Sequence, residues 1–139
     1  PEGQRRLGLQ LKHDISVPPG SIGEFLKAAD KQCYELLDGV RINAFGHLGD
    51  GNVHYNLSPP IGQKDFSGRE KEFAVNIARL ANGMKGSFAA EHGLGRSKVA
   101  LADTLRHPIE RQLMARFKSA LDKKNLFNPG VIVTRGGSL

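Results

Sequence analysis

The strongest constraint on the fold is a tight-turn signal, Asp50-Gly51, flanked on both sides by extended-type sequence. A two-residue type I′ turn needs positive φ at both central positions, and Asp-Gly is a favoured pair there. We therefore predict a hairpin whose strands cover residues 40–48 and 53–58. Pro59 and Pro60 follow directly and end the second strand.

Strands and helices are predicted to alternate around this hairpin. Two Ser-x-x-Glu patterns, Ser21–Glu24 and Ser67–Glu70, are typical of capping boxes at helix starts. Apolar residues follow each pattern at helical spacing, and partial alternation marks further strands. The predicted elements are a strand over 7–16, a helix from 21 to near 39, a helix from 67 to about 84, and a strand over 86–91.

The resulting order, βαββαβ, predicts the α+β class with a ferredoxin-like antiparallel sheet and its helices on one face. C-terminal helices are expected near 97–101 and over 108–124. The apolar stripe of the last helix is expected to face inward. Its members are Ile109, Leu113, Phe117 and Leu121.

Composition excludes several classes of protein. The 139 residues suit one domain, and no run of about 18 apolar residues predicts a membrane span. The net charge of +6 is spread along the chain, without the aromatic-basic interleaving of nucleic-acid binders. Cys33 is the only cysteine. We expect a buried thiol in a reducing compartment, the cytoplasm or the mitochondrial matrix.

The hairpin also suggests a metal site. If Asp50 and Gly51 are the two turn residues, His47 lies opposite His54, with Cβ atoms roughly 4.5–5.5 Å apart. Asn56 shares the face of His54 because side chains alternate along a strand. Glu91 ends the predicted fourth strand at the same sheet edge. Two imidazoles and one carboxylate leave an open coordination position, as catalytic metal sites do.

Taken alone, these residues leave other interpretations open. Paired histidines in a hairpin are more often surface or hydrogen-bonded groups, and the glycine-rich segment after Glu91 can be a simple turn. A stand-alone metal-dependent hydrolase, with His92 as its base, would use the same ligands. A non-catalytic ferredoxin-like module that binds anions is a third alternative.

Four segments together resemble the C-terminal domain of FAD-linked oxidases. They are LKHDISVP (11–18), GHLGDGNVH (46–54), EHGLGRSK (91–98) and NPG (128–130), in family order across nearly the whole chain. That family includes D-lactate dehydrogenase, the flavin subunit of glycolate oxidase and D-2-hydroxyglutarate dehydrogenase. The resemblance implies a flavin-dependent oxidation of D-2-hydroxy acids to 2-oxo acids.

The resemblance also implies roles for particular residues. His47, His54 and Glu91 match ligands of a divalent metal, commonly zinc. His92 matches a substrate-contacting general base, which takes the hydroxyl proton as hydride leaves for the flavin.

Three further positions match residues at the substrate or the flavin. Lys12 matches a lysine that pairs with the substrate carboxylate, and Asn56 matches a substrate contact. Asn128 falls in a tail expected near the flavin.

This sequence departs from the family pattern at two points. Val131 stands where the family often has lysine, and the family's upstream arginine is not placed on Arg5 or Arg6. Residues 1–139 are expected to form the C-terminal domain only, with FAD held mainly by a domain that this sequence lacks. That domain and a small 2-hydroxy acid are the expected partners, and a homodimer is left open. The chain by itself is expected to be inactive as a dehydrogenase.

Overall fold

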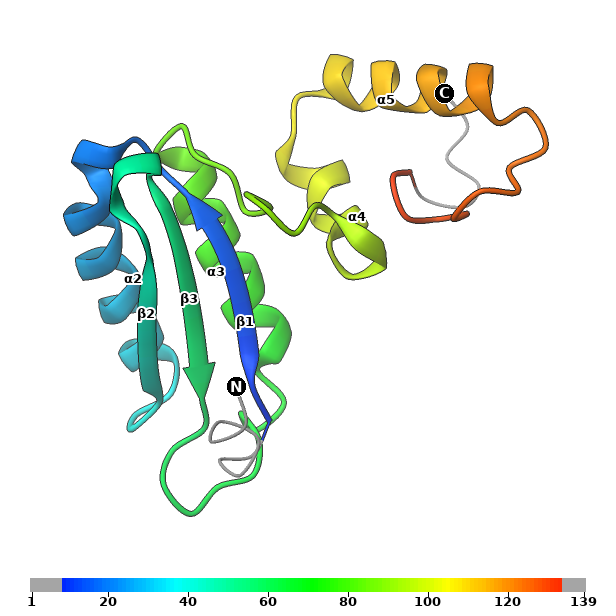
Figure 1. Ribbon diagram of the computed structural model, residues 1–139. Coiled ribbons are helices and arrows are strands. Elements are labelled where there is room, and N and C mark those ends of the chain that lie inside the picture. The colour runs from blue at the N-terminus through cyan, green and yellow to red at the C-terminus, as the bar shows by residue number, and fades with distance from the viewer. Residues whose placement is uncertain (1–8, 134–139) are drawn as a thin grey trace. The chain divides into compact units, whose positions relative to one another are not determined.

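Three antiparallel strands form the sheet: β1 (Leu11–Ser16), β2 (Arg41–His47) and β3 (Asn52–Ser58), in the order β1-β3-β2 (Figure 1). This computed structural model describes residues 9–133, which divide into two units at Glu91 and His92. The first unit also contains η1 (Pro19–Ser21), α2 (Ile22–Leu36), η2 (Leu48–Asp50) and α3 (Glu70–Gly83). The predicted α+β class is confirmed.

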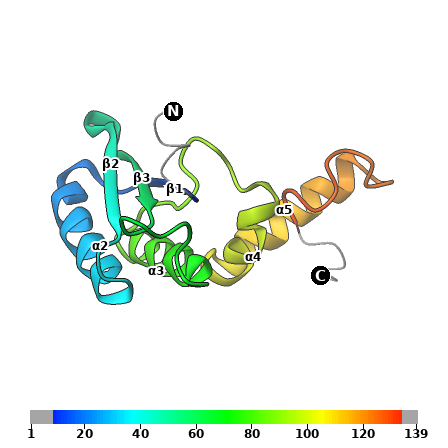
Figure 2. The same cartoon turned by 90° about the horizontal axis from the view of Figure 1, so that it is seen from below.

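The two faces of the sheet differ in polarity. Ile15, Val53, Tyr55 and Leu57 are buried on one face, and Figure 2 shows α2 and α3 on the same side of the sheet. The ring of Tyr55 packs edge-on against Phe25 of α2, with centroids 5.9 Å apart. The opposite face carries polar side chains, and neither helix of the first unit covers it. Its central members are Lys12, Asp14, Asn52, His54 and Asn56.

The hairpin forms, but its predicted register is wrong by two residues. His47 pairs with Asn52, and His54 pairs with Phe45. The turn is not a two-residue type I′ turn, because Leu48–Asp50 form a 3₁₀ turn and Gly51 alone is left-handed, with φ of 72°. A four-residue connection therefore replaces the predicted two-residue one.

Neither predicted capping box is present. The helix α2 continues from η1 with Ser21 in a helical conformation and without a side-chain cap. Before α3, Ser67 has φ of 58°, and its backbone N–H donates to Asp65 instead. Ser21 therefore stands at the N-cap position of α2 without making the capping hydrogen bond, whereas Arg69 and not Ser67 is the N-cap residue of α3.

The predicted fourth strand over 86–91 is wrong, because the segment makes only an isolated antiparallel bridge between Ser87 and Ser16. Beyond the bridge, side chains accept from two of its N–H groups. Ala89 N–H donates to Ser87 Oγ, and Glu91 N–H donates to the carboxylate of Asp14. Because these two N–H groups bond to side chains, they do not pair with the backbone of β1. The fourth strand of a ferredoxin-like sheet is therefore not formed.

The second unit contains α4 (Gly95–Leu105) and α5 (Pro108–Leu121). Proline stands at the first position of α5, as predicted, and the His107 side chain caps it by accepting from Ile109 N–H. The inward stripe predicted for α5 is wrong, because its four apolar side chains are 48–84% exposed. Helical spacing places them on one face, but it does not supply a layer to cover that face. Within residues 9–133, no helix has the length and apolar character that crossing a membrane requires.

Candidate functional site

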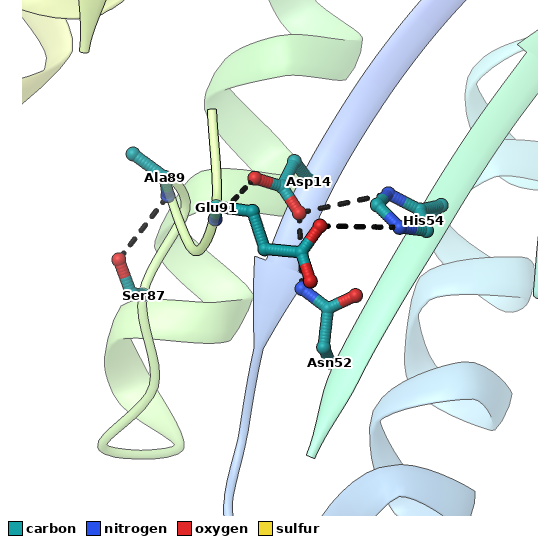
Figure 3. A network of polar contacts seen from close by, with 6 residues as sticks. All are labelled: Asp14, Asn52, His54, Ser87, Ala89 and Glu91. Carbon is teal, nitrogen blue, oxygen red and sulfur yellow. Dashed lines mark hydrogen bonds and ion pairs between the residues drawn. The ribbon is translucent and has the colours of Figure 1, made fainter. Parts of the chain in front are cut away.

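The imidazole of His54 faces two carboxylates on the polar sheet face, one near each ring nitrogen (Figure 3). Its Nδ1 atom is 3.6 Å from Asp14 Oδ1, and its Nε2 atom is 3.7 Å from Glu91 Oε2. The His54 side chain is 17% exposed, whereas that of Asp14 is 1% exposed and that of Glu91 is 52% exposed. The site thus combines a buried carboxylate, a largely buried imidazole and a half-exposed carboxylate.

The sheet register explains this arrangement. Asp14 and His54 are directly paired on β1 and β3, so their side chains leave the same face as neighbours. Glu91 reaches them from the segment that follows α3. Donor atoms of Asp14, His54 and Glu91 all lie within 4.8 Å of one another.

Asp14 was not identified as a site residue from the sequence. Its carboxylate accepts two hydrogen bonds, from Asn52 Nδ2 at 3.0 Å and from Glu91 N–H at 2.6 Å. A signal was present, because Asp14 lies two residues after Lys12 and therefore shares its face of the strand. The sequence did not show that Asp14 is buried. A buried carboxylate must be hydrogen-bonded, and this one is the centre of a polar network.

The histidine pair is brought together as predicted, although in a different register. The ring centroids of His47 and His54 are 6.2 Å apart, with planes at 77°. They are diagonal neighbours on one face, while Phe45 is the direct partner of His54, with centroids 5.2 Å apart. Because the register differs by two residues, both imidazoles still leave the same face.

Lys12 and Asn56 are paired with each other on that face, one row away from Asp14 and His54. Two residues along a strand span about 6.6 Å, so the two rows are near neighbours. Lys12 is exposed, whereas Asn56 is 6% exposed. The row therefore offers one cation at the surface and one amide closer to the interior.

His92 follows Glu91 directly and belongs to the same group: one ligand atom each of Asp14, His54, Glu91 and His92 lies within 4.8 Å of the others. It is the first residue of the second unit. Asn128 also belongs to the second unit, where it has φ of 45° in the turn before Pro129. Arg5 and Arg6 lie outside the described residues. The roles predicted for His92 and Asn128 stay predictions.

The donor types suit a divalent metal. One imidazole and carboxylate oxygens are ligands that Zn²⁺, Mn²⁺ and Fe²⁺ accept. His54 Nε2 and Glu91 Oε2 are 3.7 Å apart, and two metal–ligand bonds of about 2.0–2.2 Å can span that gap. Asn52 Oδ1 is buried and lacks a hydrogen-bond partner within residues 9–133, so the network contains an acceptor still to be satisfied.

Comparison with known proteins adds independent information. A family model described as "FAD linked oxidases, C-terminal domain" matches residues 3–132. A D-2-hydroxyglutarate dehydrogenase of Stutzerimonas stutzeri is 34% identical over 123 residues, covering 87% of this chain and 26% of that protein. A D-lactate dehydrogenase of Archaeoglobus fulgidus is 31% identical over 134 residues, covering 96% of this chain and 29% of that protein.

Similarity extends to mitochondrial proteins. The mitochondrial D-2-hydroxyglutarate dehydrogenase of Bos taurus is 30% identical over 128 residues, covering 92% of this chain and 23% of that protein. The chain spans about a quarter of the length of these curated relatives.

Proposed function

Because the chain belongs to the family of FAD-linked oxidase C-terminal domains, we propose that it is the substrate- and metal-binding part of a flavin-dependent dehydrogenase of D-2-hydroxy acids. Relatives named D-2-hydroxyglutarate dehydrogenase and D-lactate dehydrogenase support this substrate class. The observation that carries the proposal is the polar sheet face, where His54, Asp14 and Glu91 meet one row from Lys12 and Asn56.

We propose His54, Glu91 and His47 as the residues that hold a divalent metal, with zinc as the expected ion. The 3.7 Å separation of His54 Nε2 and Glu91 Oε2 and the adjacent His47 ring support this ligand set. When bound, such an ion lowers the pKa of a coordinated hydroxyl and orients its substrate. His54 is held by the central strand, whereas Glu91 is exposed enough for a small molecule to reach it.

Lys12 and Asn56 are proposed to bind the substrate. The Lys12 ammonium is exposed beside the site and would pair with the substrate carboxylate. The Asn56 amide, largely buried, would donate to or accept from the polar groups of the substrate. Their row is adjacent to that of His54, so one small hydroxy acid can contact both rows.

His92 is proposed as the general base that removes the hydroxyl proton, because it follows the ligand Glu91 directly in the chain. FAD, when bound, supplies the acceptor for the two electrons of the oxidation. We propose that FAD is held mainly by the remainder of a longer protein, and that Asn128 lies near the flavin. The short span of this chain against its relatives supports that division.

Metal content measured by elemental mass spectrometry tests the ligand set. The purified chain is expected to hold about one zinc or manganese ion, and His47→Ala, His54→Ala and Glu91→Ala are expected to lose it. His107→Ser is the matched control, because it removes a histidine outside the sheet while serine can still cap α5. Metal retained in all three ligand variants, with the fold intact by circular dichroism, would refute the assignment.

Activity is tested with the flavin-binding domain present. The longer protein is expected to reduce an artificial electron acceptor with D-lactate or D-2-hydroxyglutarate and not with the L enantiomers. Flavin bleaching under anaerobic conditions reports the same half-reaction without an external acceptor. A flavin that stays oxidised with every D-2-hydroxy acid tested would overturn the proposed substrate class.

A further inference from the structure

We infer that Asp14 is a positioning residue that aims His54 and Glu91 at the metal. This inference rests on the proposed metal role of those two residues. Asp14 is the one described side chain that hydrogen-bonds the backbone of Glu91 while facing the ring of His54. It would act through both ligands without taking a coordination position itself.

The first step of the argument is the fixed orientation of the carboxylate. Asp14 is 1% exposed and lies between β3 and the segment that carries Glu91. Asn52 Nδ2 donates to Oδ1, and the backbone N–H of Glu91 donates to Oδ2. One donor on each oxygen sets the plane of the carboxylate, and a buried side chain has little freedom to turn away.

The second step concerns the His54 ring. Asp14 Oδ1 faces Nδ1 at 3.6 Å, which is longer than a hydrogen bond. A carboxylate on that side favours the tautomer with its proton on Nδ1, which leaves the Nε2 lone pair on the side of Glu91. We expect Asp14 Oδ1 and His54 Nδ1 to move into hydrogen-bond distance when a metal ion coordinates Nε2. A metal-binding histidine commonly donates its second N–H to a carboxylate in this manner.

The third step concerns Glu91. The segment that carries it is tied to β1 by the Ser16–Ser87 bridge and by Ala90 N–H, which donates to the Asp14 carbonyl at 3.3 Å. The bond from Glu91 N–H to the Asp14 side chain is the last of these ties. Removing the carboxylate would release the backbone at the ligand itself, while the earlier ties remain.

Zinc affinity of the full chain, measured by competition with a chromophoric chelator, tests the inference. Asp14→Ala and Asp14→Asn are expected to weaken zinc binding by about 10–100-fold, and saturating zinc should still fill the site. Asn43→Ala is the matched control, because it changes an exposed polar residue on the same sheet face. Binding by both Asp14 variants within about twofold of the wild type would overturn the inference.

A second measurement needs no variant, so it remains decisive if the Asp14 variants do not fold. Long-range ¹H–¹⁵N spectra of histidine-labelled chain report which ring nitrogen of His54 carries the proton. With zinc bound, we expect the proton on Nδ1 and the metal on Nε2; the reverse arrangement would overturn the inference. If the wild type binds no zinc, the proposed ligand set is wrong. In that case the metal-free spectrum still tests Asp14, because an Nε2–H tautomer of His54 would overturn its positioning role.

Discussion

The carboxylate of Asp14 accepts the backbone N–H of Glu91 at 2.6 Å, across 77 positions of sequence. Asp14 lies on β1, and Glu91 ends the segment that follows α3, so the bond closes the first unit around its polar face. Together with the bond from Ala89 N–H to Ser87 Oγ, it explains why residues 86–91 do not continue as a strand. A side chain takes the N–H group that a ladder partner would otherwise use.

The approach of this segment to β1 requires a glycine at position 86. A Cβ atom there would lie 1.9 Å from the Ser16 carbonyl oxygen and 2.9 Å from that of Ala81. Gly86→Ala is expected to lower the free energy of unfolding by roughly 2–4 kcal/mol and to weaken zinc binding, because backbone atoms must move apart.

Urea unfolding followed by circular dichroism measures the change at position 86. Gly83→Ala is the matched control, since open space surrounds a Cβ there and alanine favours the helix by up to about 1 kcal/mol. Equal stability of the two variants would show that Gly86 does not pack against β1.

The hairpin turn requires glycine at position 51. Gly51 has φ of 72°, and a Cβ atom would lie 2.0 Å from the Val17 carbonyl oxygen. The Gly51 carbonyl also accepts from Val17 N–H at 3.0 Å, which joins the turn to the end of β1. Gly51→Ala is expected to destabilise the chain by roughly 2–4 kcal/mol in thermal or urea unfolding.

The same turn provides the control. Gly49→Ala introduces the same methyl group into open space, so its effect is expected to stay within about 0.5 kcal/mol. A comparable loss in both variants would attribute the cost to the turn sequence in general and not to the contact with Val17.

Cys33 is expected to react slowly in the folded chain. Burial raises the pKa of its thiol to about 11 from an ordinary 9.0, and Asp30 adds to the rise while the Tyr55 hydroxyl opposes it. At pH 8 the thiolate fraction is then about 100-fold smaller than for an exposed thiol. Alkylation by iodoacetamide should therefore be at least about 100-fold slower in native protein than in denaturant, and equal rates would contradict the buried position.

Asp122 organises the segment that leads to Asn128. Its carboxylate accepts from Lys118 and from the backbone N–H groups of Leu126 and Phe127, both at 2.9 Å. The Lys118 bond is the main reason that the pKa of Asp122 lies below its ordinary 3.8, with the two backbone bonds adding to it. A depressed pKa means that this stabilisation is present above about pH 3.8 and is lost as the pH falls through the folded-state value.

NMR titration of the Leu126 and Phe127 amides measures this directly. Both amide shifts are expected to move together at a pH below 3.8, and Asp122→Asn should abolish the shared transition. A transition at or above 3.8 would show that the carboxylate does not hold the loop.

Local pattern was sufficient for several features. The Asp-Gly turn signal and the prolines after residue 58 correctly indicated a hairpin with a strand over 53–58, and helical spacing correctly located α2, α3 and α5. His47 and His54 were correctly placed on one face despite the wrong register. The error was two residues, and side chains on a strand repeat every two residues, so the face was preserved.

Other features depended on contacts that no local pattern contains. The register depended on the turn at 48–51, where Gly51 meets the end of β1. The capping boxes at Ser21 and Ser67 failed because the preceding turns already fix the backbone there.

The sequence by itself therefore determined the class of fold and the shared sheet face of His47, His54 and Asn56. Only the tertiary structure placed a buried Asp14 between His54 and the backbone of Glu91, and showed that the apolar stripe of α5 is exposed. The physical reason is the distance along the sequence between the interacting residues. Periodicity records which way a side chain points from its own strand or helix, whereas burial and long-range hydrogen bonds depend on which segment the folded chain brings against it.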